Sequence, residues 1–578
     1  DTTRLLADDV IVRGEVQSPV DALQVVAGTM TVETLNVHSV AEVPNSGLSA
    51  DRLILEIAET IEIAGWLRGG ASVNVTAGTN ILIGHDPVGE PGAEPAIRAA
   101  SVVLHSGGTI SKIPDAAMNI VATNLELRAA TGISDLDVSV DTLDASTAVG
   151  DIELRESDPV DGPADGLILT HVSAPNGSVK ILSVNRLEAR TVIATGSNGG
   201  VDLESLQGNV AVAGNDTADV FQVDSYFALR TPAAFELPPR VSGEIVILES
   251  SGLMELNSEF AVTTRLELVS DGSIRMTGDV ASAGADVRIT ALGNAPSGAV
   301  ETGVITIESS RFETGHVELR APSRVEANIS SDLVLDGFVG GLSGFDPTGS
   351  IGLRAGGTLK LSSGIFAAVG EAKLIAGLIQ SGEGPLVIAE NIIAEARSSV
   401  GLRLWTNRLS ARSTVGGNIV VSEADGLIAE EIFAENGNVF ISARGDLTAV
   451  DVRVAVDAAG NDVTLEAIGD LFVGKVIAGE AAGAVKAHSQ VTLDAFGTIR
   501  EPADAVDNSG DLVDVDAWKI NLKHGQPIPE PVLVTGPDVT GSSDELEIVS
   551  VDNLSDAGTA LSDKLSIEAQ GDYVLAAP

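Results

Sequence analysis

The sequence predicts an all-β protein of the β-solenoid type, in which short strands follow one another around stacked coils. Three observations support this fold class. The chain of 578 residues is 44% hydrophobic, with a mean hydropathy of +0.25, yet it contains only 12 Phe, 3 Trp and 2 Tyr. Short segments of alternating apolar and polar residues recur along its length, and long blocks of the sequence echo each other. A core made of Val, Ile, Leu and Ala is thin and repetitive, as in a solenoid.

The recurring unit is a short strand-like segment closed by Gly, Asn or Asp. Alternation with period two in segments rich in Val, Ile and Thr is the signal of a strand. The clearest examples are 30–37 (MTVETLNV), 72–75 (SVNV), 80–83 (NILI), 124–128 (NLELR), 151–155 (DIELR), 178–182 (SVKIL) and 462–467 (DVTLEA). Residues 51–68 and 369–380 contain enough Ala, Leu and Glu for a helix. Because 51–65 (DRLILEIAETIEIAG) also alternates with period two, we expect strands there.

Two pairs of sequence blocks echo each other. Residues 143–182 correspond to 409–442, so that Asp151–Leu154 matches Asn418–Val421 and Gly166–Ile168 matches Gly426–Ile428. A second echo joins 102–132 to 491–525. The gaps between echoed features fall in turns, while the strands keep their length. Solenoids vary in this way, because each coil of about 20 residues supplies short strands that pair with the coils above and below.

A string of immunoglobulin-like β-sandwiches is the structural alternative. Such domains carry about one core Trp per 100 residues and a Tyr near one corner. Three Trp and two Tyr in 578 residues fit that architecture poorly. The solenoid therefore remains the leading fold.

The domain organisation follows from these patterns. Residues 1–523 are assigned to solenoid repeats, with echoed blocks at 102–182 and 409–525, and the Pro-, Gly- and Ser-rich residues 524–545 to a linker. Strand-like segments resume in residues 546–578, which are too few to bury a core alone. We expect this short β unit to dock on the solenoid or to pair with the next subunit by strand addition. Because head-to-tail contacts do not close, copies would join end to end into a homopolymer.

The charge excludes several classes of partner. The chain has 82 acidic and 34 basic residues and a formal net charge of −48. Nucleic acids and anionic membrane surfaces require clustered Lys and Arg, so neither is an expected partner. No uninterrupted apolar run is long enough to insert into a membrane as a helix. The chain contains no Cys and opens with DTTRLLADD, without a signal sequence, so a secreted form would already be processed or be a fragment.

No catalytic signature is present in the sequence. It contains no HExxH, GxSxG, P-loop or GxGxxG motif. Histidines occur singly, at positions 38, 85, 105, 171, 316, 488 and 524, and are expected to lie on isolated polar faces or turns. Trp66, Trp405 and Trp518 are too far apart in sequence to form one sugar-stacking groove. The chain is therefore expected not to be an enzyme, with a carbohydrate-active β-helix enzyme as the alternative.

Acidic turns are the only candidate metal sites. Calcium takes six to eight oxygen ligands from carboxylates and turn carbonyls, and acidic loops can supply them. None of these loops matches an EF-hand or a nine-residue GGxGxD repeat, and solvated turns are the competing interpretation. A calcium-dependent surface-layer subunit is a further alternative function. The candidate ligands are Asp158, Asp161, Asp165, Asn215, Asp216 and Asp219.

The succession of short strand-like segments resembles that of known repetitive proteins. Residues 462–499 (DVTLEAIGDLFVGKVIAGEAAGAVKAHSQVTLDAFGTI) resemble the repeats of filamentous haemagglutinin-like secreted proteins, and 124–145 look similar to the large repetitive surface proteins of planctomycetes. The resemblance implies a right-handed parallel β-helix rod that is exported and acts in adhesion or surface structure. We therefore expect a secreted, extracellular structural or adhesive protein without a cofactor other than calcium. Its expected partners are copies of itself and surface glycans or host or neighbouring cells.

Overall fold

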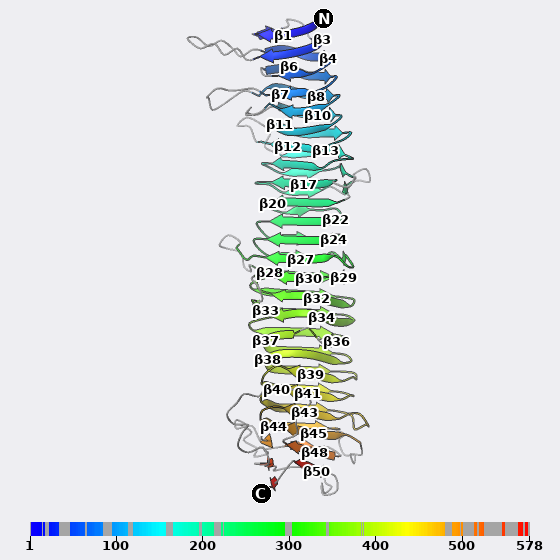
Figure 1. The fold of residues 1–578 in the computed structure, drawn as a ribbon, viewed down its shortest axis with the longest axis vertical. Coiled ribbons are helices and arrows are strands. Elements are labelled where there is room, and N and C mark those ends of the chain that lie inside the picture. Colours follow the sequence, from blue (N-terminus) through cyan, green and yellow to red (C-terminus); the bar gives the residue numbers. More distant parts are fainter. Residues whose placement is uncertain are drawn as a thin grey trace, which may run out of the picture. The chain divides into compact units, whose positions relative to one another are not determined.

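The computed structural model describes residues 2–575 apart from 14, 18–21, 34–46, 64–65, 85–94, 114–119, 158–165, 196–198, 213–220, 224, 295–302, 343–345, 383, 385, 480–487, 498, 501–513, 517–518, 525–545, 549–564 and 570–572. The chain divides into two compact units, residues 1–272 and 273–578. The described residues of both units form strands and turns and include no helix. The predicted all-β fold is therefore confirmed (Figure 1).

The strands of the first unit are β1(Thr2–Arg13), β2(Glu15–Gln17), β3(Ala22–Glu33), β4(Gly47–Ile57), β5(Ile61–Ile63), β6(Trp66–Ala77), β7(Ile81–Ile83), β8(Ile97–Ser106), β9(Thr109–Lys112), β10(Ile120–Ala129), β11(Gly132–Thr147), β12(Ile152–Glu156), β13(Leu167–Ala174), β14(Val179–Ser183), β15(Leu187–Ala189), β16(Val192–Ala194), β17(Gly200–Ser205), β18(Val210–Val212), β19(Phe221–Val223), β20(Tyr226–Thr231), β21(Phe235–Glu236), β22(Arg240–Ser250), β23(Met254–Leu256) and β24(Glu259–Ser270).

The strands of the second unit are β25(Ile274–Met276), β26(Val280–Ala281), β27(Asp286–Ala291), β28(Val304–Ser309), β29(Phe312–Glu313), β30(Val317–Arg320), β31(Arg324–Ile329), β32(Leu333–Gly340), β33(Ser350–Ala355), β34(Thr358–Ala367), β35(Glu371–Ala376), β36(Leu378–Ser381), β37(Leu386–Ala396), β38(Val400–Ser413), β39(Ile419–Glu423), β40(Leu427–Ala434), β41(Val439–Ala443), β42(Leu447–Val454), β43(Val463–Ala467), β44(Leu471–Ala478), β45(Gln490–Ala495), β46(Ile499–Arg500), β47(Asp514–Asp516), β48(Lys519–His524), β49(Leu546–Ile548), β50(Leu565–Ala569) and β51(Tyr573–Leu575).

Each unit is a β-solenoid whose strands pair in parallel with strands one coil away. In the first unit, Asn124 pairs with Thr142 across a short coil, whereas Ser72 pairs with Ser101 across a longer one. In the second unit, Ile419 pairs with Val439, and the coil between them has the length expected from the sequence. The coil length therefore varies along the chain. Parallel pairing rules out immunoglobulin-like sandwiches, whose sheets are antiparallel.

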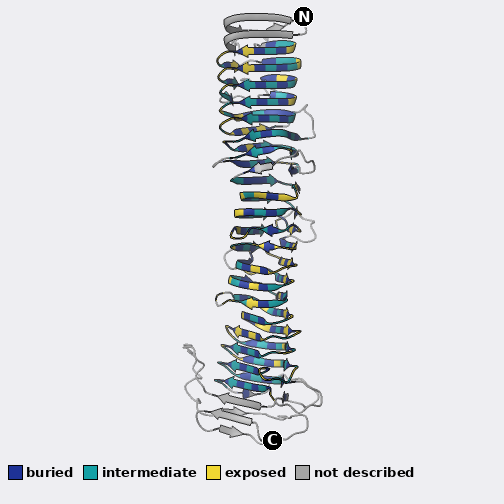
Figure 2. Cartoon of the chain, turned by 90° about the vertical axis from the view of Figure 1, so that its right-hand side faces the viewer, coloured by how far each residue is buried: buried dark blue, intermediate teal, exposed yellow. Residues whose placement is uncertain are grey.

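The core of each unit consists of columns of stacked aliphatic side chains. In the second unit, Val421, Ile441, Leu465 and Leu493 follow one another in register, and none is more than 2% exposed. Neighbouring residues along each strand point outward, so that buried and more exposed positions alternate (Figure 2). Coils stack about 4.8 Å apart, a spacing that branched aliphatic side chains fill well, and a few phenylalanines such as Phe260 and Phe366 are also fully buried. Most of the core is therefore aliphatic, as the composition of the chain predicts.

Polar side chains at the turns also link neighbouring coils. Buried hydroxyls donate to carbonyls of the preceding coil, as Ser205 does to Asn185 at 2.6 Å. Carboxylates and amides of the turns accept backbone N–H groups of the following coil. Asn418, Asn438 and Asp462 form such a series, and their Oδ1 atoms accept from the next coil at 2.8–2.9 Å. Asp and Asn are therefore frequent in the turns because they satisfy backbone donors.

The strand predictions agree with the structure wherever it describes the chain. The window 51–65, expected to form strands, contains most of β4 and all of β5. The second window with helical composition, 369–380, forms β35 and the start of β36. The predicted segment 30–37 overlaps the end of β3 at Glu33, and its remainder lies outside the described residues.

The C-terminal segment contributes strands to the same parallel stack. β49 pairs with β46, β50 pairs with β48, and β51 pairs with β49. Most of the predicted linker, residues 525–545, lies outside the described residues, and His524 ends β48.

Candidate functional site

Blocks 143–182 and 409–442 form the same lateral face, one in each unit. β13 and β40 occupy equivalent positions in their blocks and share a register shift against the preceding coil. In the first unit, Leu143 pairs with Leu169 and Asp144 with His171, which leaves Thr170 as an extra residue. In the second, Leu409 pairs with Ala429 and Ser410 with Glu431, which leaves Glu430 as the extra residue. A β-bulge of this kind redirects side chains and often borders functional surfaces.

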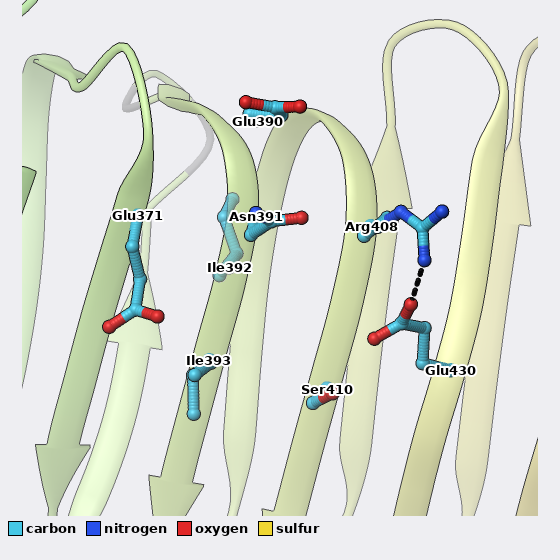
Figure 3. A pocket seen from close by; sticks show the side chains of 8 residues that line it. All are labelled: Glu371, Glu390, Asn391, Ile392, Ile393, Arg408, Ser410 and Glu430. Atoms are coloured by element: carbon cyan, nitrogen blue, oxygen red, sulfur yellow. Dashed lines mark hydrogen bonds and ion pairs between the residues drawn. The ribbon is translucent and has the colours of Figure 1, made fainter.

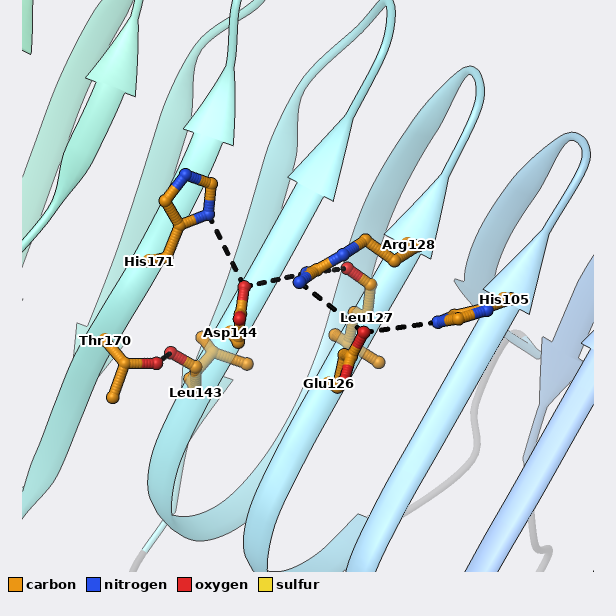
Figure 4. Close-up of polar contacts among 8 residues, drawn as sticks. All are labelled: His105, Glu126, Leu127, Arg128, Leu143, Asp144, Thr170 and His171. Atoms are coloured by element: carbon orange, nitrogen blue, oxygen red, sulfur yellow. Dashed lines mark hydrogen bonds and ion pairs between the residues drawn. The ribbon is translucent and has the colours of Figure 1, made fainter.

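On the first unit this face carries alternating basic and acidic side chains, which we call the charge ladder (Figure 4). His105 Nε2 lies 3.3 Å from Glu126, and Arg128 lies 3.5 Å from Glu126 and 2.8 Å from Asp144. His171 Nδ1 lies 3.5 Å from the same Asp144 carboxylate. The hydrogen bond to Asp144 raises the pKa of Arg128. The five side chains come from β8, β10, β11 and β13, so the ladder ties four successive coils together.

The contacts of the charge ladder help to hold neighbouring coils together. Its side chains are between a third and half exposed, and an exposed ion pair such as that of Arg128 with Asp144 contributes about 0–1 kcal/mol. At the bulge, Thr170 Oγ1 donates to the Leu143 carbonyl oxygen at 2.9 Å, which satisfies an acceptor beside the shifted register. These contacts hold coils in register along a face that would otherwise depend on backbone pairing alone.

The equivalent face of the second unit contains a shallow groove of about 410 Å³ (Figure 3). Glu371, Glu390 and Glu430 line it together with Arg408, which is paired with Glu430. These side chains belong to β35, β37, β38 and β40, which pair one after another, and Figure 3 shows how they lie on these strands. Three carboxylates and one guanidinium can bind polar ligands by hydrogen bonds, and carboxylates in a groove are also the groups that glycoside hydrolysis uses.

Each echoed block also has a glutamate that points inward. Glu156 and Glu423 end β12 and β39 and are 5% and 1% exposed. Glu156 Oε2 accepts from Ser183 Oγ at 2.8 Å and from the Val184 N–H at 3.0 Å. Ala443, directly after the second block, occupies the position equivalent to Ser183, directly after the first, and its side chain cannot donate.

The carboxyl of Glu423 is consequently only half satisfied. Its Oε1 accepts from the N–H groups of Thr406, Ala424 and Asp425 at 3.0–3.3 Å. Its Oε2 is buried without a hydrogen-bond partner among the described residues. Burial raises the pKa of Glu423 to about 7, although these backbone hydrogen bonds favour the charged form and oppose that rise.

The predicted calcium ligands cannot be placed. Asp158, Asp161, Asp165, Asn215, Asp216 and Asp219 all lie outside the described residues. Within the described ranges, no group of three or more His, Asp or Glu side chains is arranged to hold a metal ion. The acidic turns that are described serve the coil-to-coil hydrogen bonds instead.

Residues that the sequence shows as isolated are brought together by the fold. His105 and His171 are far apart in the sequence, yet both belong to the charge ladder. Sequence spacing misses them because the relevant period is the variable coil length. The echo between blocks 143–182 and 409–442 is the signal that could have located this face. Of the tryptophans, Trp66 is buried, Trp405 is 54% exposed, and Trp518 is outside the described residues.

Comparison with known proteins adds no relative to this picture. No helix in the described part of the chain is long and apolar enough to cross a membrane. No family model, no curated protein and no solved structure matches the chain. The architecture is that of a repetitive β-helix protein, and its role has to be argued from the molecule itself.

Proposed function

We propose that this chain is a structural or adhesive protein of the cell surface, built as an elongated rod that associates end to end. The observation that carries the proposal is how the polar side chains are used. In both units, turn amides, hydroxyls, carboxylates and arginines contact the neighbouring coil. Stacking similar repeats gives a long and regular surface, which suits a scaffold or an adhesive fibre.

The terminal strands support association between copies. Among the described residues, β1 pairs with β3 and β50 pairs with β48. In the described part of the chain, no further strand pairs with the other edge of β1 or β50. Unpaired edges invite another strand. The proposed contact joins the outer edge of the C-terminal strands of one copy to β1 of the next.

Negative-stain electron microscopy of the purified chain tests this proposal. The full chain should appear as rods that join into filaments, and a chain ending at Glu545 should appear as single rods. Compact particles would contradict the rod. Equal polymerisation of the truncated chain would contradict a contact made by residues 546–578.

Export to the outside of the cell is part of the same proposal. The strand cadence resembles filamentous haemagglutinin-like secreted proteins and large planctomycete surface proteins, and the absence of Cys fits an exported protein. A net charge of −48 keeps a long apolar-rich molecule soluble and disfavours nucleic acid and anionic membranes as partners. Surface glycans and neighbouring cells are the proposed targets.

A carbohydrate-active enzyme is the second candidate, because of the carboxylate-lined groove on β35, β37, β38 and β40. We expect no turnover of neutral or acidic polysaccharides by the full chain. Activity that is lost in Glu390→Gln or Glu371→Gln, but kept in Glu326→Gln outside the groove, would establish the enzyme instead.

A further inference from the structure

The echoed blocks each contain an asparagine followed by glycine in the turn between two strands. Asn176–Gly177 lies between β13 and β14, and Asn436–Gly437 lies between β40 and β41. A Cβ at Gly177 would lie 2.2 Å from the Gly150 carbonyl oxygen. One at Gly437 would lie 2.4 Å from the Gly417 carbonyl oxygen, so the stack of coils requires glycine at both places. A third Asn–Gly sequence, 198–199, begins outside the described residues.

An asparagine before a glycine can react with its own backbone, because glycine has no side chain to obstruct the approach. The glycine nitrogen attacks Cγ of the asparagine, and a bond between these two atoms closes a cyclic imide. The bond from Cγ to Nδ2 breaks, and Nδ2 leaves as ammonia with the proton of the glycine N–H. Water then opens the imide at either carbonyl carbon and gives aspartate or isoaspartate. Solvent water is the only co-reactant.

The two Asn–Gly pairs differ at the N–H of the glycine. Gly177 is buried, and its N–H donates to the Ala174 carbonyl oxygen at 3.2 Å. The nitrogen must lose this proton before it can attack, so the hydrogen bond protects Asn176 from cyclisation. The Gly437 N–H has no acceptor among the described residues, and Asn436 is exposed. Base from the solvent can therefore remove the proton of Gly437.

The side-chain amide of Asn436 is held by a buried donor. Asn461 Nδ2 donates to Asn436 Oδ1 at 2.8 Å and to the Val456 carbonyl oxygen at 2.8 Å. Because a carbonyl oxygen only accepts, the contact with Val456 fixes which end of the Asn461 amide faces Asn436. Asn461 is 4% exposed. Negative charge develops on Oδ1 as the nitrogen attacks Cγ, and a positioned donor at that atom stabilises the transition state.

The amide of Asn176 has the opposite arrangement. Its Nδ2, which is the leaving nitrogen, donates to the Ala148 carbonyl oxygen at 3.1 Å. No donor faces its Oδ1 among the described residues. The leaving group is thus held in place, while the developing charge is not stabilised. The first block therefore supplies a natural comparison for the second.

We propose that Asn436–Gly437 is a site of spontaneous deamidation, at which the folded chain modifies itself with the help of the Asn461 amide. The change adds a negative charge next to Glu435. Where isoaspartate forms, it also adds one main-chain carbon to the turn and displaces the Asn436 carbonyl oxygen, which accepts from the Gly417 N–H at 2.5 Å. The reaction belongs to the chain itself and does not depend on the proposed adhesive function.

Mass spectrometry of the full chain tests this inference. The protein is kept in mildly alkaline buffer, and samples are digested with an acid protease, since acid slows further deamidation. Position 436 should accumulate the imide, whose mass is lower by one ammonia, and then aspartate and isoaspartate. We expect this to occur about tenfold faster than at position 176. In chain unfolded by urea, both pairs lose their surroundings, and the two rates should become similar.

A variant tests the role of the buried donor. Asn461→Asp has nearly the same shape but no amide donor, so it should slow the reaction at position 436 about tenfold and leave position 176 unchanged. Asn209→Asp is the matched control. It adds the same charge in a turn of the first unit and keeps an acceptor for the Ala234 N–H. Circular dichroism should be unchanged in both variants.

Three outcomes would overturn the inference. The first is a rate at position 436 in the folded chain that does not exceed the rate at position 176. The second is a ratio of the two rates that is the same in the folded and the unfolded chain. The third is a folded Asn461→Asp variant that reacts at position 436 as fast as Asn209→Asp does. If Asn461→Asp does not fold, the first two comparisons, which use the unaltered chain, decide.

Discussion

Replacing Ala443 with Ser is expected to stabilise the coils around Glu423, because it restores a hydrogen bond that the echoed block already has. Ser183 pairs in register with Glu156 and donates to its Oε2 at 2.8 Å. Ala443 pairs in register with Glu423, whose Oε2 is buried without a partner among the described residues. The natural sequence of one block thus supplies the design for the other.

The stability gained by Ala443→Ser depends on whether the Glu423 carboxyl is protonated. A hydrogen bond to a charged group contributes about 1.5–3 kcal/mol, and burying the new hydroxyl offsets part of it, so a net gain of about 1–2 kcal/mol is expected above pH 8. The gain should be smaller at pH 5, where Glu423 is protonated. The reciprocal change, Ser183→Ala, should cost about 1–3 kcal/mol, since it removes a donor from Glu156.

The pH dependence has a definite sign. The pKa of Glu423 is about 7 in the folded chain, above the ordinary value of 4.5, so the folded state binds the proton more tightly than the unfolded state does. This residue therefore favours folding fully below pH 4.5, and its contribution is lost as the pH rises to about 7. The loss is about 3 kcal/mol. Glu423→Gln should recover most of it at pH 8.5 and change little at pH 5.

Amide hydrogen exchange of β39 and β41 is the assay, because it reports local opening in a repeat protein whose coils need not unfold together. At pH 8.5, Ala443→Ser should slow exchange about 5- to 30-fold after correction for intrinsic rates. Faster or unchanged exchange, or a larger effect at pH 5 than at pH 8.5, would refute the assignment of an unsatisfied, proton-binding Glu423.

Three further predictions concern the stack. Leu465→Ala should cost about 2–5 kcal/mol locally, since Leu465 is fully buried in the core column, whereas Thr464→Ala on the outer face should cost under about 0.5; hydrogen exchange of β43 measures both, and equal effects would contradict the column. Asn438→Ala should cost about 1 kcal/mol by removing the acceptor for the Asp462 N–H, and a β41–β43 contact of unchanged stability in the same assay would speak against the turn series. Chelation of calcium should leave the thermal midpoint unchanged, and a fall of several degrees would identify a calcium site, with the Asp158–Asp165 loop the first to mutate.

Much of the fold could be predicted because the buried and exposed positions of solenoid strands appear in the sequence as alternating apolar and polar residues. In 51–65, the Ile and Leu residues that alternate with charged ones are the buried residues of β4 and β5. The same alternation places Glu423 on the inner face with Ile419 and Val421, so the buried carboxyl was readable in principle. Its unsatisfied oxygen was not, because that depends on Ala443 in the next coil.

The lateral sites could not be predicted from spacing. His105 and Glu126 are neighbours across one coil, and so are Arg128 and Asp144, but the two coils that separate them differ in length. Coil length varies with each turn, so no fixed period brings such pairs into alignment. Strand register, which is a property of the assembled stack, is what makes them neighbours.

Labelling of intact cells that produce the protein is the measurement that tests the central claim most directly. An antibody raised against the chain should label unpermeabilised cells as strongly as permeabilised ones, because the proposed structural or adhesive role requires exposure at the surface. Labelling that appears only after permeabilisation would contradict that role.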